Sequence, residues 1–155
     1  MSKNFWLFKT EPSSFSLADL KKCPQQTTCW DGVRNYQARN LLRDTVRCGD
    51  GVLFYHSRVQ PMAAVGVAKV VREAYADPSQ FQEQSKYFDP AATEQQPRWC
   101  AVDIRFEKEF ARPVTLQHMR LQTELATMAL LQKGSRLSIQ PVSAAHWRFI
   151  LELGS

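Results

Sequence analysis

The apolar residues near the start of the chain predict a strand and then a short helix. Phe5-Trp6-Leu7-Phe8 is apolar on both faces of a two-residue period, which is typical of a strand buried on two sides. Ser16 is a candidate N-cap, with Asp19 three residues later, for a helix that runs to Lys22. Lys9 follows the strand, so it is either a surface charge with a buried stem or a cation at the rim of a pocket.

A second helix is predicted after an Asp-Gly turn. Asp31-Gly32 predicts a turn because glycine accepts a positive φ. Asn35 is a candidate N-cap for the helix that follows. The helix then carries an apolar stripe with helical spacing, made of Ala38, Leu41, Leu42 and Thr45. Another face carries Arg39, Arg43 and Arg47 at every fourth position. Such like charges repel by roughly 0.2–0.5 kcal/mol per pair, so the row either tolerates that cost or faces an anion.

The middle of the chain predicts a β-hairpin and one further strand. Residues 52–57 and 63–72 are mostly apolar and flank a loop, which favours two antiparallel strands. Residues 99–106 alternate between two faces, as in a half-buried strand. Arg112-Pro113-Val114 is expected to break this strand, because proline cannot donate to the ladder.

The last third of the chain predicts helices around a final strand. Thr115 is expected to cap a short helical turn, and residues 124–133 have the apolar spacing of a helix that ends at Gly134. The residues of that helix expected to face inward are Leu125, Met128 and Leu131. Residues 137–140 are the predicted last strand, and Ser143 is the expected N-cap of a terminal helix. The apolar stripe of the terminal helix is Trp147, Ile150 and Leu151.

Charge is distributed unevenly along the chain. The net charge is +5, yet the segment from Asp77 to Pro97 holds four acidic residues against Lys86, a net of −3, which leaves +8 elsewhere. A loop of about 20 residues in a compact domain is usually functional or disordered, and the aromatic residues of this one indicate that it packs on the body. Such segregation is expected if one surface meets phosphate, and chance clustering of solvated charges gives the same pattern.

Length and composition indicate a single domain, residues 1–155. The chain is 44% hydrophobic and 23% charged, as in ordinary soluble globular proteins. No apolar run approaches the roughly 18 residues of a membrane span, and no signal peptide is evident. The four cysteines form no C-x-x-C pair and are expected to be reduced thiols. We expect a cytoplasmic protein, nuclear if the source is eukaryotic, that is a monomer and has no membrane partner.

The residue pattern gives little support to catalysis or metal binding. Cys48 with His56, or Cys100 with His146, are formal nucleophile–base pairs, but no spacing supports them. The chain has neither H-E-x-x-H nor paired cysteines for a metal, and neither of the glycine-rich phosphate-binding loops. We expect no enzyme activity, no catalytic residues, no cofactor and no metal.

Several motifs resemble the EVE domain, a PUA-like fold related to the YTH and ASCH domains. The longest is Trp30-Asp31-Gly32-Val33-Arg34-Asn35-Tyr36-Gln37-Ala38-Arg39-Asn40. The others, in the family's order, are residues 6–12, Phe54-Tyr55-His56-Ser57, Pro97-Arg98-Trp99, Arg112-Pro113-Val114 and residues 136–142. The resemblance covers nearly the whole chain. It implies a mixed α/β (α+β) fold with a curved, mostly antiparallel, β-barrel-like sheet and flanking short helices.

The resemblance also implies a function and a site. It associates the chain with nucleic acid, DNA or RNA, that carries a modified base such as a modified cytosine, bound through an aromatic pocket. Recognising one base needs a flat surface for stacking and a few donors and acceptors for its edge. The residues expected in the pocket are Lys9, Trp30, Val33, Arg34, Asn35, Tyr36, Ser57, Trp99, Arg136, Leu137 and Ser138. Arg39 and Arg43 are expected to contact phosphates, which position a strand without specifying its sequence.

Other hypotheses stay open at this stage. An isolated tryptophan such as Trp30 or Trp99 packs in a core more often than it lines a pocket. A PUA-like domain can also bind structured RNA by shape and backbone contacts, without a modification pocket. A hydrolase that uses Cys48 is a third and less favoured hypothesis. Trp30→Ala is expected to separate the first two, because it removes a preference for the modification only where Trp30 forms the pocket.

Overall fold

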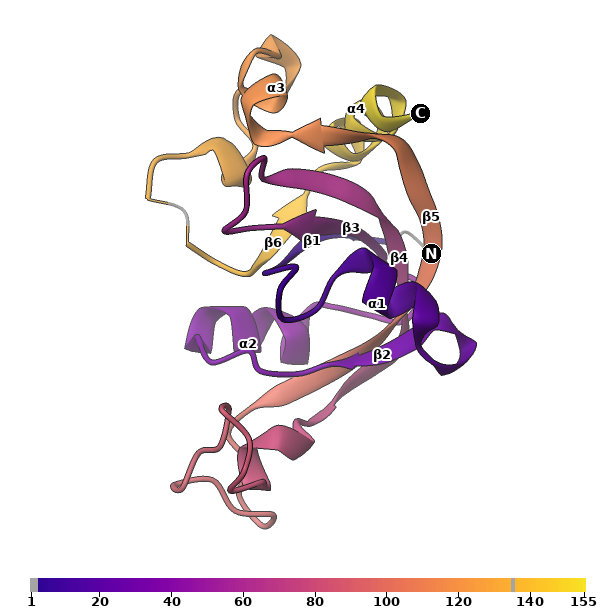
Figure 1. Ribbon diagram of the computed structural model, residues 1–155. Coiled ribbons are helices and arrows are strands. Elements are labelled where there is room, and N and C mark those ends of the chain that lie inside the picture. The colour runs from indigo at the N-terminus through magenta and orange to yellow at the C-terminus, as the bar shows by residue number, and fades with distance from the viewer. Residues whose placement is uncertain (1–2, 135) are drawn as a thin grey trace.

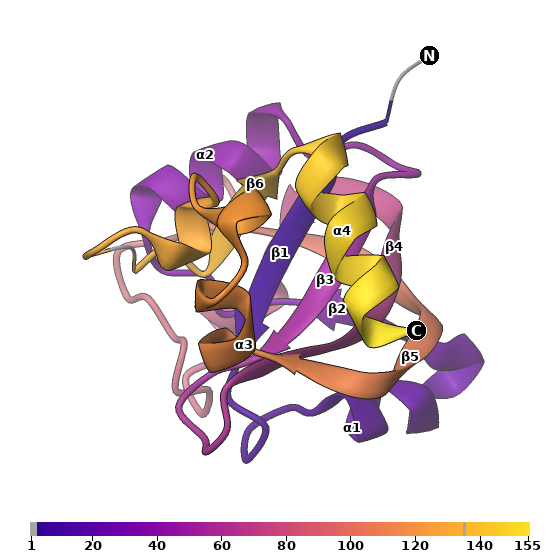
Figure 2. The same cartoon turned by 90° about the horizontal axis from the view of Figure 1, so that it is seen from above.

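A six-stranded sheet with short helices on both faces forms the computed structural model, which describes residues 3–134 and 136–155 (Figures 1 and 2). The strands are β1 Phe5–Thr10, β2 Thr27–Trp30, β3 Gly51–His56, β4 Ala63–Ala76, β5 Cys100–Thr115 and β6 Ile139–Val142. Their spatial order is β2-β5-β4-β3-β1-β6, and every neighbouring pair is antiparallel except β1 with β3. The predicted mixed α/β class with a mostly antiparallel sheet is confirmed. The sheet is strongly curved but open, with β2 and β6 at its edges.

The helices begin where the sequence places their caps. They are α1 Leu17–Lys22, α2 Tyr36–Asp44, α3 Leu116–Arg120 and α4 Ala144–Gly154. The side chains of Ser16, Asn35, Thr115 and Ser143 each accept the backbone N–H three residues later, which satisfies a donor that the first helical turn leaves unpaired. No helix among the described residues is long and apolar enough to cross a membrane.

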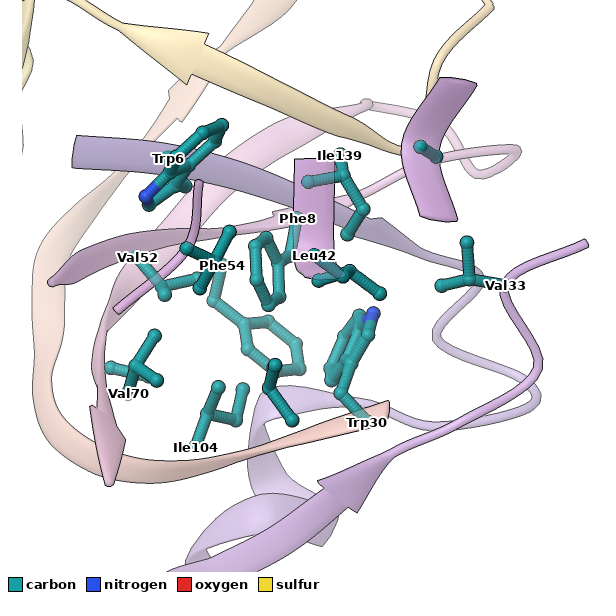
Figure 3. Packing of buried hydrophobic residues seen from close by; sticks show 14 of the residues in the cluster. Trp6, Phe8, Trp30, Val33, Leu42, Val52, Phe54, Val70, Ile104 and Ile139 are labelled. Atoms are coloured by element: carbon teal, nitrogen blue, oxygen red, sulfur yellow. The ribbon is translucent and has the colours of Figure 1, made fainter. Parts of the chain in front are cut away.

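Two hydrophobic clusters lie on opposite faces of the sheet. Trp6 and Phe8 of β1 face the first cluster and Leu7 faces the second, which confirms a strand buried on both sides. The first cluster is closed by α1 and α2 and contains Trp30 (Figure 3). The second is closed by α3 and α4, with Trp147 stacked on Phe5 at 4.5 Å between ring centroids.

The predicted break in the fifth strand is wrong, because β5 continues through Pro113 to Thr115. Val114 pairs with Ala64 of β4, and the next registered pair is Gly66 with Glu109. Pro113 therefore lies within a register shift, where its missing N–H removes no ladder bond. The fourth strand also runs to Ala76, four residues past its predicted end.

The predicted helix over residues 124–133 is also wrong. Two 3₁₀ turns, η3 Thr123–Leu125 and η4 Ala129–Leu131, take its place, and Met128 between them has an extended backbone. Leu125 and Met128 are buried as predicted, whereas Leu130 is buried and Leu131 only partly so. Apolar residues three apart share a face in a 3₁₀ turn as they do in an α-helix, so the pattern alone does not separate the two. The last strand, β6, begins two residues later than predicted.

Asp50 is a buried polar residue that joins the start of the chain to the turn before β3. It is 2% exposed. Its carboxylate accepts the indole N–H of Trp6 at 2.9 Å and the backbone N–H groups of Asn4 at 3.0 Å and Arg47 at 2.9 Å. Three donors satisfy the charge that burial would otherwise penalise.

Candidate functional site

A cleft of about 1110 Å³ opens beside the turn that follows β2. Its walls come from the end of β1, residues 28–35, residues 57–62, residues 86–87 and residues 136–138. The basic side chains on these walls are Lys9, Arg34, Arg58, Lys86 and Arg136, against the acidic Glu11 and Asp31. The cleft therefore carries a surplus of positive charge, which favours an anionic ligand.

Backbone hydrogen bonds bring together segments that are distant in sequence. The Lys9 N–H donates to the Ser138 carbonyl at 2.9 Å, and the Ser57 N–H donates to the Thr10 carbonyl at 2.9 Å. Eight of the predicted pocket residues line the cleft: Lys9, Trp30, Val33, Arg34, Asn35, Ser57, Arg136 and Ser138. Tyr36, Trp99 and Leu137 are not among its lining residues. Leu137 packs instead against the first hydrophobic cluster.

Trp30 belongs to the core and to the cleft at once. It is 7% exposed, and its ring centroid lies 5.4 Å from that of Phe8 and 5.5 Å from that of Phe54. Its indole N–H donates no hydrogen bond to any described residue, and Figure 3 shows the nitrogen on the side of the ring toward Val33 and away from Ile104. Trp30 thus packs in the first hydrophobic cluster and leaves a donor at the cleft.

Lys9 lies at the rim of the cleft. It is half-buried, and burial lowers the pKa of its ammonium group below the usual 10.5. Among the described residues it makes no ion pair and no side-chain hydrogen bond. Of the two alternatives for Lys9, the structure supports a cation at a pocket, and a half-buried charge without a carboxylate favours binding of an anion.

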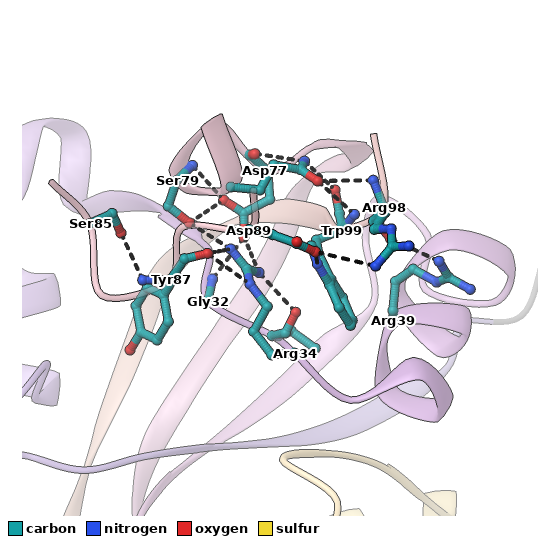
Figure 4. Close-up of polar contacts among 12 residues, drawn as sticks. Gly32, Arg34, Arg39, Asp77, Ser79, Ser85, Tyr87, Asp89, Arg98 and Trp99 are labelled. Atoms are coloured by element: carbon teal, nitrogen blue, oxygen red, sulfur yellow. Dashed lines mark hydrogen bonds and ion pairs between the residues drawn. The ribbon is translucent and has the colours of Figure 1, made fainter. Parts of the chain in front are cut away.

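Arg34 holds one wall of the cleft in place (Figure 4). It donates to the Asp77 carboxylate at 2.9 Å, the Ser79 hydroxyl at 3.1 Å and the Tyr87 carbonyl at 2.6 Å. Asp77 is fully buried and also accepts the Gly32 N–H at 2.8 Å. The guanidinium donors are therefore used by the segment between β4 and β5. Arg34 thus holds this segment in place at the cleft, and it also lines the cleft itself.

Tyr36 and Trp99 form a stack outside the cleft. Their ring centroids are 4.8 Å apart, and the Trp99 indole N–H donates to Asp89 at 2.7 Å (Figure 4). Tyr36 is 52% exposed, and the Arg39 guanidinium lies over its ring at 4.9 Å. Tyr36 therefore packs on Trp99 and Arg39 and not on Trp30.

The predicted phosphate-contacting arginines already have partners on the protein. Arg39 donates to the Arg98 carbonyl at 2.8 Å and to the Asn40 side chain at 3.0 Å. Arg43 is paired with Asp44 at 2.8 Å, and both side chains are about half exposed. An exposed ion pair such as Arg43 with Asp44 is weak, so Arg43 is able to exchange this contact for a phosphate, whereas the charge of Arg39 meets only neutral oxygens in these contacts.

Several residues of the cleft are not among those predicted from the sequence. Phe15 lies against Trp30 at 6.3 Å between ring centroids, and Tyr87 stands under the Arg34 guanidinium at 5.6 Å. Burial raises the pKa of Cys29 to about 11 and, with nearby Asp77, raises the pKa of Asp31 above its usual value. The aromatic residues of the segment 77–97 indicate that Tyr87 packs on the body of the protein. No feature of the sequence indicates that this segment bonds to Arg34.

Two of the groups that are formal nucleophile and base candidates in the sequence have other surroundings in the structure. The His56 Nε2 atom accepts the Leu17 N–H at 3.1 Å and so helps to cap α1. Cys48 is exposed and its backbone N–H donates to Glu73. Within the described residues, no three His, Cys, Asp or Glu side chains are placed to hold a metal ion.

Comparison with known proteins places these features in a family. A sequence model of the EVE domain matches residues 4–153. Thymocyte nuclear protein 1 of Mus musculus is 40% identical over 167 residues, which cover 97% of this chain and 73% of the mouse protein. An uncharacterised protein of Schizosaccharomyces pombe is 34% identical, over 97% of this chain and 68% of its own length.

Solved structures agree with the fold. A crystal structure of a Pseudomonas syringae protein superposes with a TM-score of 0.92 at 43% identity, covering 97% of this chain and 99% of that one. The human THYN1 protein in complex with 5-methylcytosine-containing DNA has a TM-score of 0.91 at 38% identity, covering 99% of this chain and 98% of that one. An ASCH protein of Zymomonas mobilis, at 12% identity and a TM-score of 0.57, shares the fold alone.

Proposed function

Because the chain belongs to the EVE domain family, we propose that it binds DNA carrying a modified cytosine and holds the modified base in the cleft beside Trp30. A solved relative was crystallised with DNA that contains 5-methylcytosine, and this supports the proposal. The role is binding and not catalysis. RNA carrying a modified base is a second ligand class for the same cleft, and the protein acts as a monomer.

The observation that carries the proposal is the pair of free donors in the cleft. The Trp30 indole N–H and the Lys9 ammonium have no partner among the described residues. Polar groups in partly buried positions are normally paired, so these two groups are available to bind a ligand. A base edge offers acceptors to the indole, and a phosphate or a carbonyl oxygen satisfies the ammonium.

The dimensions of the cleft suit a nucleotide. Ligand pockets commonly measure about 300–1,000 Å³, and this cleft reaches about 1110 Å³. Proteins that reach one base in a duplex turn it out of the stack, at a cost of a few kcal/mol. Phe15 and Trp30 supply apolar surface to the extruded base, while Asn35 and Ser138 supply acceptors and donors at its edge.

A binding comparison tests the proposal. Fluorescence anisotropy is measured with duplexes of one sequence that carry cytosine, 5-methylcytosine or 5-hydroxymethylcytosine at the same position, and with the matching single strands in DNA and RNA, at fixed salt. We expect one modified strand to bind roughly ten- to a hundredfold more tightly than the plain strand, because a methyl group in a fitted pocket is worth about 1–3 kcal/mol.

Two outcomes contradict the proposal. Equal affinities for modified and plain strands remove the modified base from the function. Tighter binding of structured RNA than of every DNA, regardless of modification, favours the alternative of an RNA-binding domain that recognises shape and backbone.

A further inference from the structure

A second cavity, of about 510 Å³, adjoins the cleft and shares Lys9, Ser57 and Met62 with it. It extends away from Trp30, between the ends of β1 and β3, α3 and residues 130–134. Its floor is apolar, with leucines from α3 and η4, and its rim is polar. None of the residues expected from the sequence to bind a base or a phosphate lines it, apart from the shared Lys9 and Ser57.

The charge of this second cavity has one sign. Lys9, Arg120 and Lys133 line it, and no aspartate or glutamate does. Among the described residues, none of these three cations forms an ion pair or a side-chain hydrogen bond. The main cleft differs, because Arg34 and Arg58 there are neutralised by Asp77 and Glu11.

Tyr55 adds a buried donor to the cavity. The residue is 1% exposed and lines the cavity, and its hydroxyl has no hydrogen-bond partner among the described residues. Burial raises the pKa of Tyr55 to about 12, while the nearby Arg120 acts to lower it, so the hydroxyl keeps its proton at neutral pH. An unpartnered hydroxyl beside unpaired cations is the arrangement that a phosphate oxygen satisfies.

We propose that this second cavity binds a backbone phosphate of the nucleotide next to the base held in the main cleft, with Arg120, Lys133 and the Tyr55 hydroxyl as its ligands. The inference rests on the function proposed above. Both cavities have Lys9 on their walls, so one DNA strand contacts the two of them in succession. The apolar floor lies under the sugar, and the cations face the phosphate. The strand thereby crosses the protein from the acidic segment toward α3.

The test combines one phosphate change with one protein change. DNA carrying 5-methylcytosine is prepared with a neutral methylphosphonate at each position near the modified base in turn, and each is titrated with the wild type, Arg120→Gln and Arg148→Gln. Arg148 is the matched control, because it is an exposed arginine on α4 that lines neither cavity. Affinity is measured over a series of salt concentrations.

We expect one methylphosphonate next to the modified base to weaken binding of the wild type and of Arg148→Gln, and to weaken binding of Arg120→Gln clearly less, because Lys133 and Tyr55 still contact the phosphate in that variant. The slope of log K against log salt should fall by about 0.9 on duplex DNA, or 0.7 on a single strand, when either partner of one phosphate contact is removed. Tyr55→Phe, which keeps the ring and removes only the hydroxyl, should weaken the same contact without changing the salt slope.

Failure of this inference is distinct from failure of the proposed function. If the wild type prefers modified DNA but Arg120→Gln and Arg148→Gln behave alike with every methylphosphonate, the phosphate site is refuted and the base-binding cleft stands. If the wild type shows no preference for modified DNA, the proposed function is refuted, and the inference that rests on it is refuted with it. Additive losses from Arg120→Gln and every methylphosphonate also refute the site, because a direct contact requires coupling between its two partners.

Discussion

At the scale of single residues, Trp30 shows how one side chain serves both fold and ligand. Its ring packs beside Phe8, Phe15 and Phe54, and its indole N–H has no partner among the described residues. From the sequence, core and pocket are alternatives for Trp30, whereas in the structure it belongs to both. Trp30→Ala is therefore a poor test of binding, because it opens a cavity in the first hydrophobic cluster.

We predict that Trp30→Ala lowers the free energy of unfolding by about 3–5 kcal/mol, as expected for a buried aromatic residue. Trp30→Phe keeps most of the packing and removes the N–H donor. It should cost less stability and still weaken binding of the modified strand by about 1 kcal/mol or more, the net worth of one hydrogen bond. Urea unfolding and anisotropy measure the two effects. Unchanged affinity in Trp30→Phe would return Trp30 to a purely structural role.

His56 gives a second prediction at this scale, concerning pH. Its Nε2 atom accepts the Leu17 N–H, which only the uncharged ring can do, and burial lowers the pKa of His56 below its usual 6.5. The unfolded chain therefore binds more protons just below pH 6.5, and stability rises with pH in that window. The contribution is complete above the unfolded pKa and is lost as pH falls toward the lowered folded pKa.

We expect the stability difference between wild type and His56→Gln to depend on pH below 6.5 and to be constant above it. Thermal unfolding across this range provides the measurement. His118→Gln is the control, because His118 is exposed and its side chain caps nothing. A difference that does not change with pH would mean that His56 has the same pKa in both states.

At the scale of elements, the segment between β4 and β5 is the least predictable part of the fold. Its acidity, its length and its aromatic residues are visible in the sequence, but the hydrogen bonds that attach it to the rest of the protein are not. Arg34 from the turn before α2 donates to three residues of this segment, and the Gly32 N–H donates to Asp77. A contact between residues more than 40 positions apart leaves no local pattern, because neither partner is periodic or apolar.

We predict that Asp77→Ala destabilises the protein by about 3 kcal/mol, because it leaves a partly buried guanidinium without its carboxylate. It should also expose residues 82–97 to limited proteolysis and reduce the preference for the modified base. Glu94→Ala removes the same charge from the same segment, where Glu94 is exposed and unpaired among the described residues, and should change none of these. Equal behaviour of the two variants would show that the wall does not depend on Arg34.

The other elements are predicted correctly where their sequence pattern fits only one structure, and wrongly where it fits two. Caps at Ser16, Asn35 and Ser143 were predicted correctly, since a short polar side chain before an apolar stripe has few other uses. The 3₁₀ turns within residues 123–131 have the sequence pattern of an α-helix, because both structures bury residues three apart. Pro113 predicts a strand break, because the sequence does not reveal the register shift that accommodates it.

At the scale of the whole molecule, the curved sheet assembles the cleft from five separate stretches of chain. The family resemblance predicted eight of its lining residues, whereas periodicity alone would have grouped none of them. Tyr36 and Trp99 are aromatic and near the motif, as expected of pocket residues, yet they stack on one another beyond the turn and do not line the cleft. Aromatic type identifies a candidate for a pocket, but only the backbone direction decides which side of the wall it occupies.

We predict that DNA binding weakens steeply as salt rises, because the chain outside the acidic segment carries +8. Each phosphate contact should contribute about 0.9 to the slope on duplex DNA and 0.7 on a single strand. Arg39→Gln should lower affinity for modified and plain strands alike, and Arg43→Gln should lower it less, because Asp44 already neutralises Arg43. Affinity that is flat from low to physiological salt would exclude phosphate contacts by this surface.

The pairing of β1 has a consequence for how the protein is made. One side of β1 bonds to β3, but the other side bonds to β6, at residues 139–142. A chain leaving the ribosome therefore carries β1 with an open edge until residues 139–142 have been synthesised. Such an edge is able to pair with other chains, so the growing protein depends on the late arrival of β6, and a chain that stops short of residue 139 is exposed to aggregation even though its other five strands are complete.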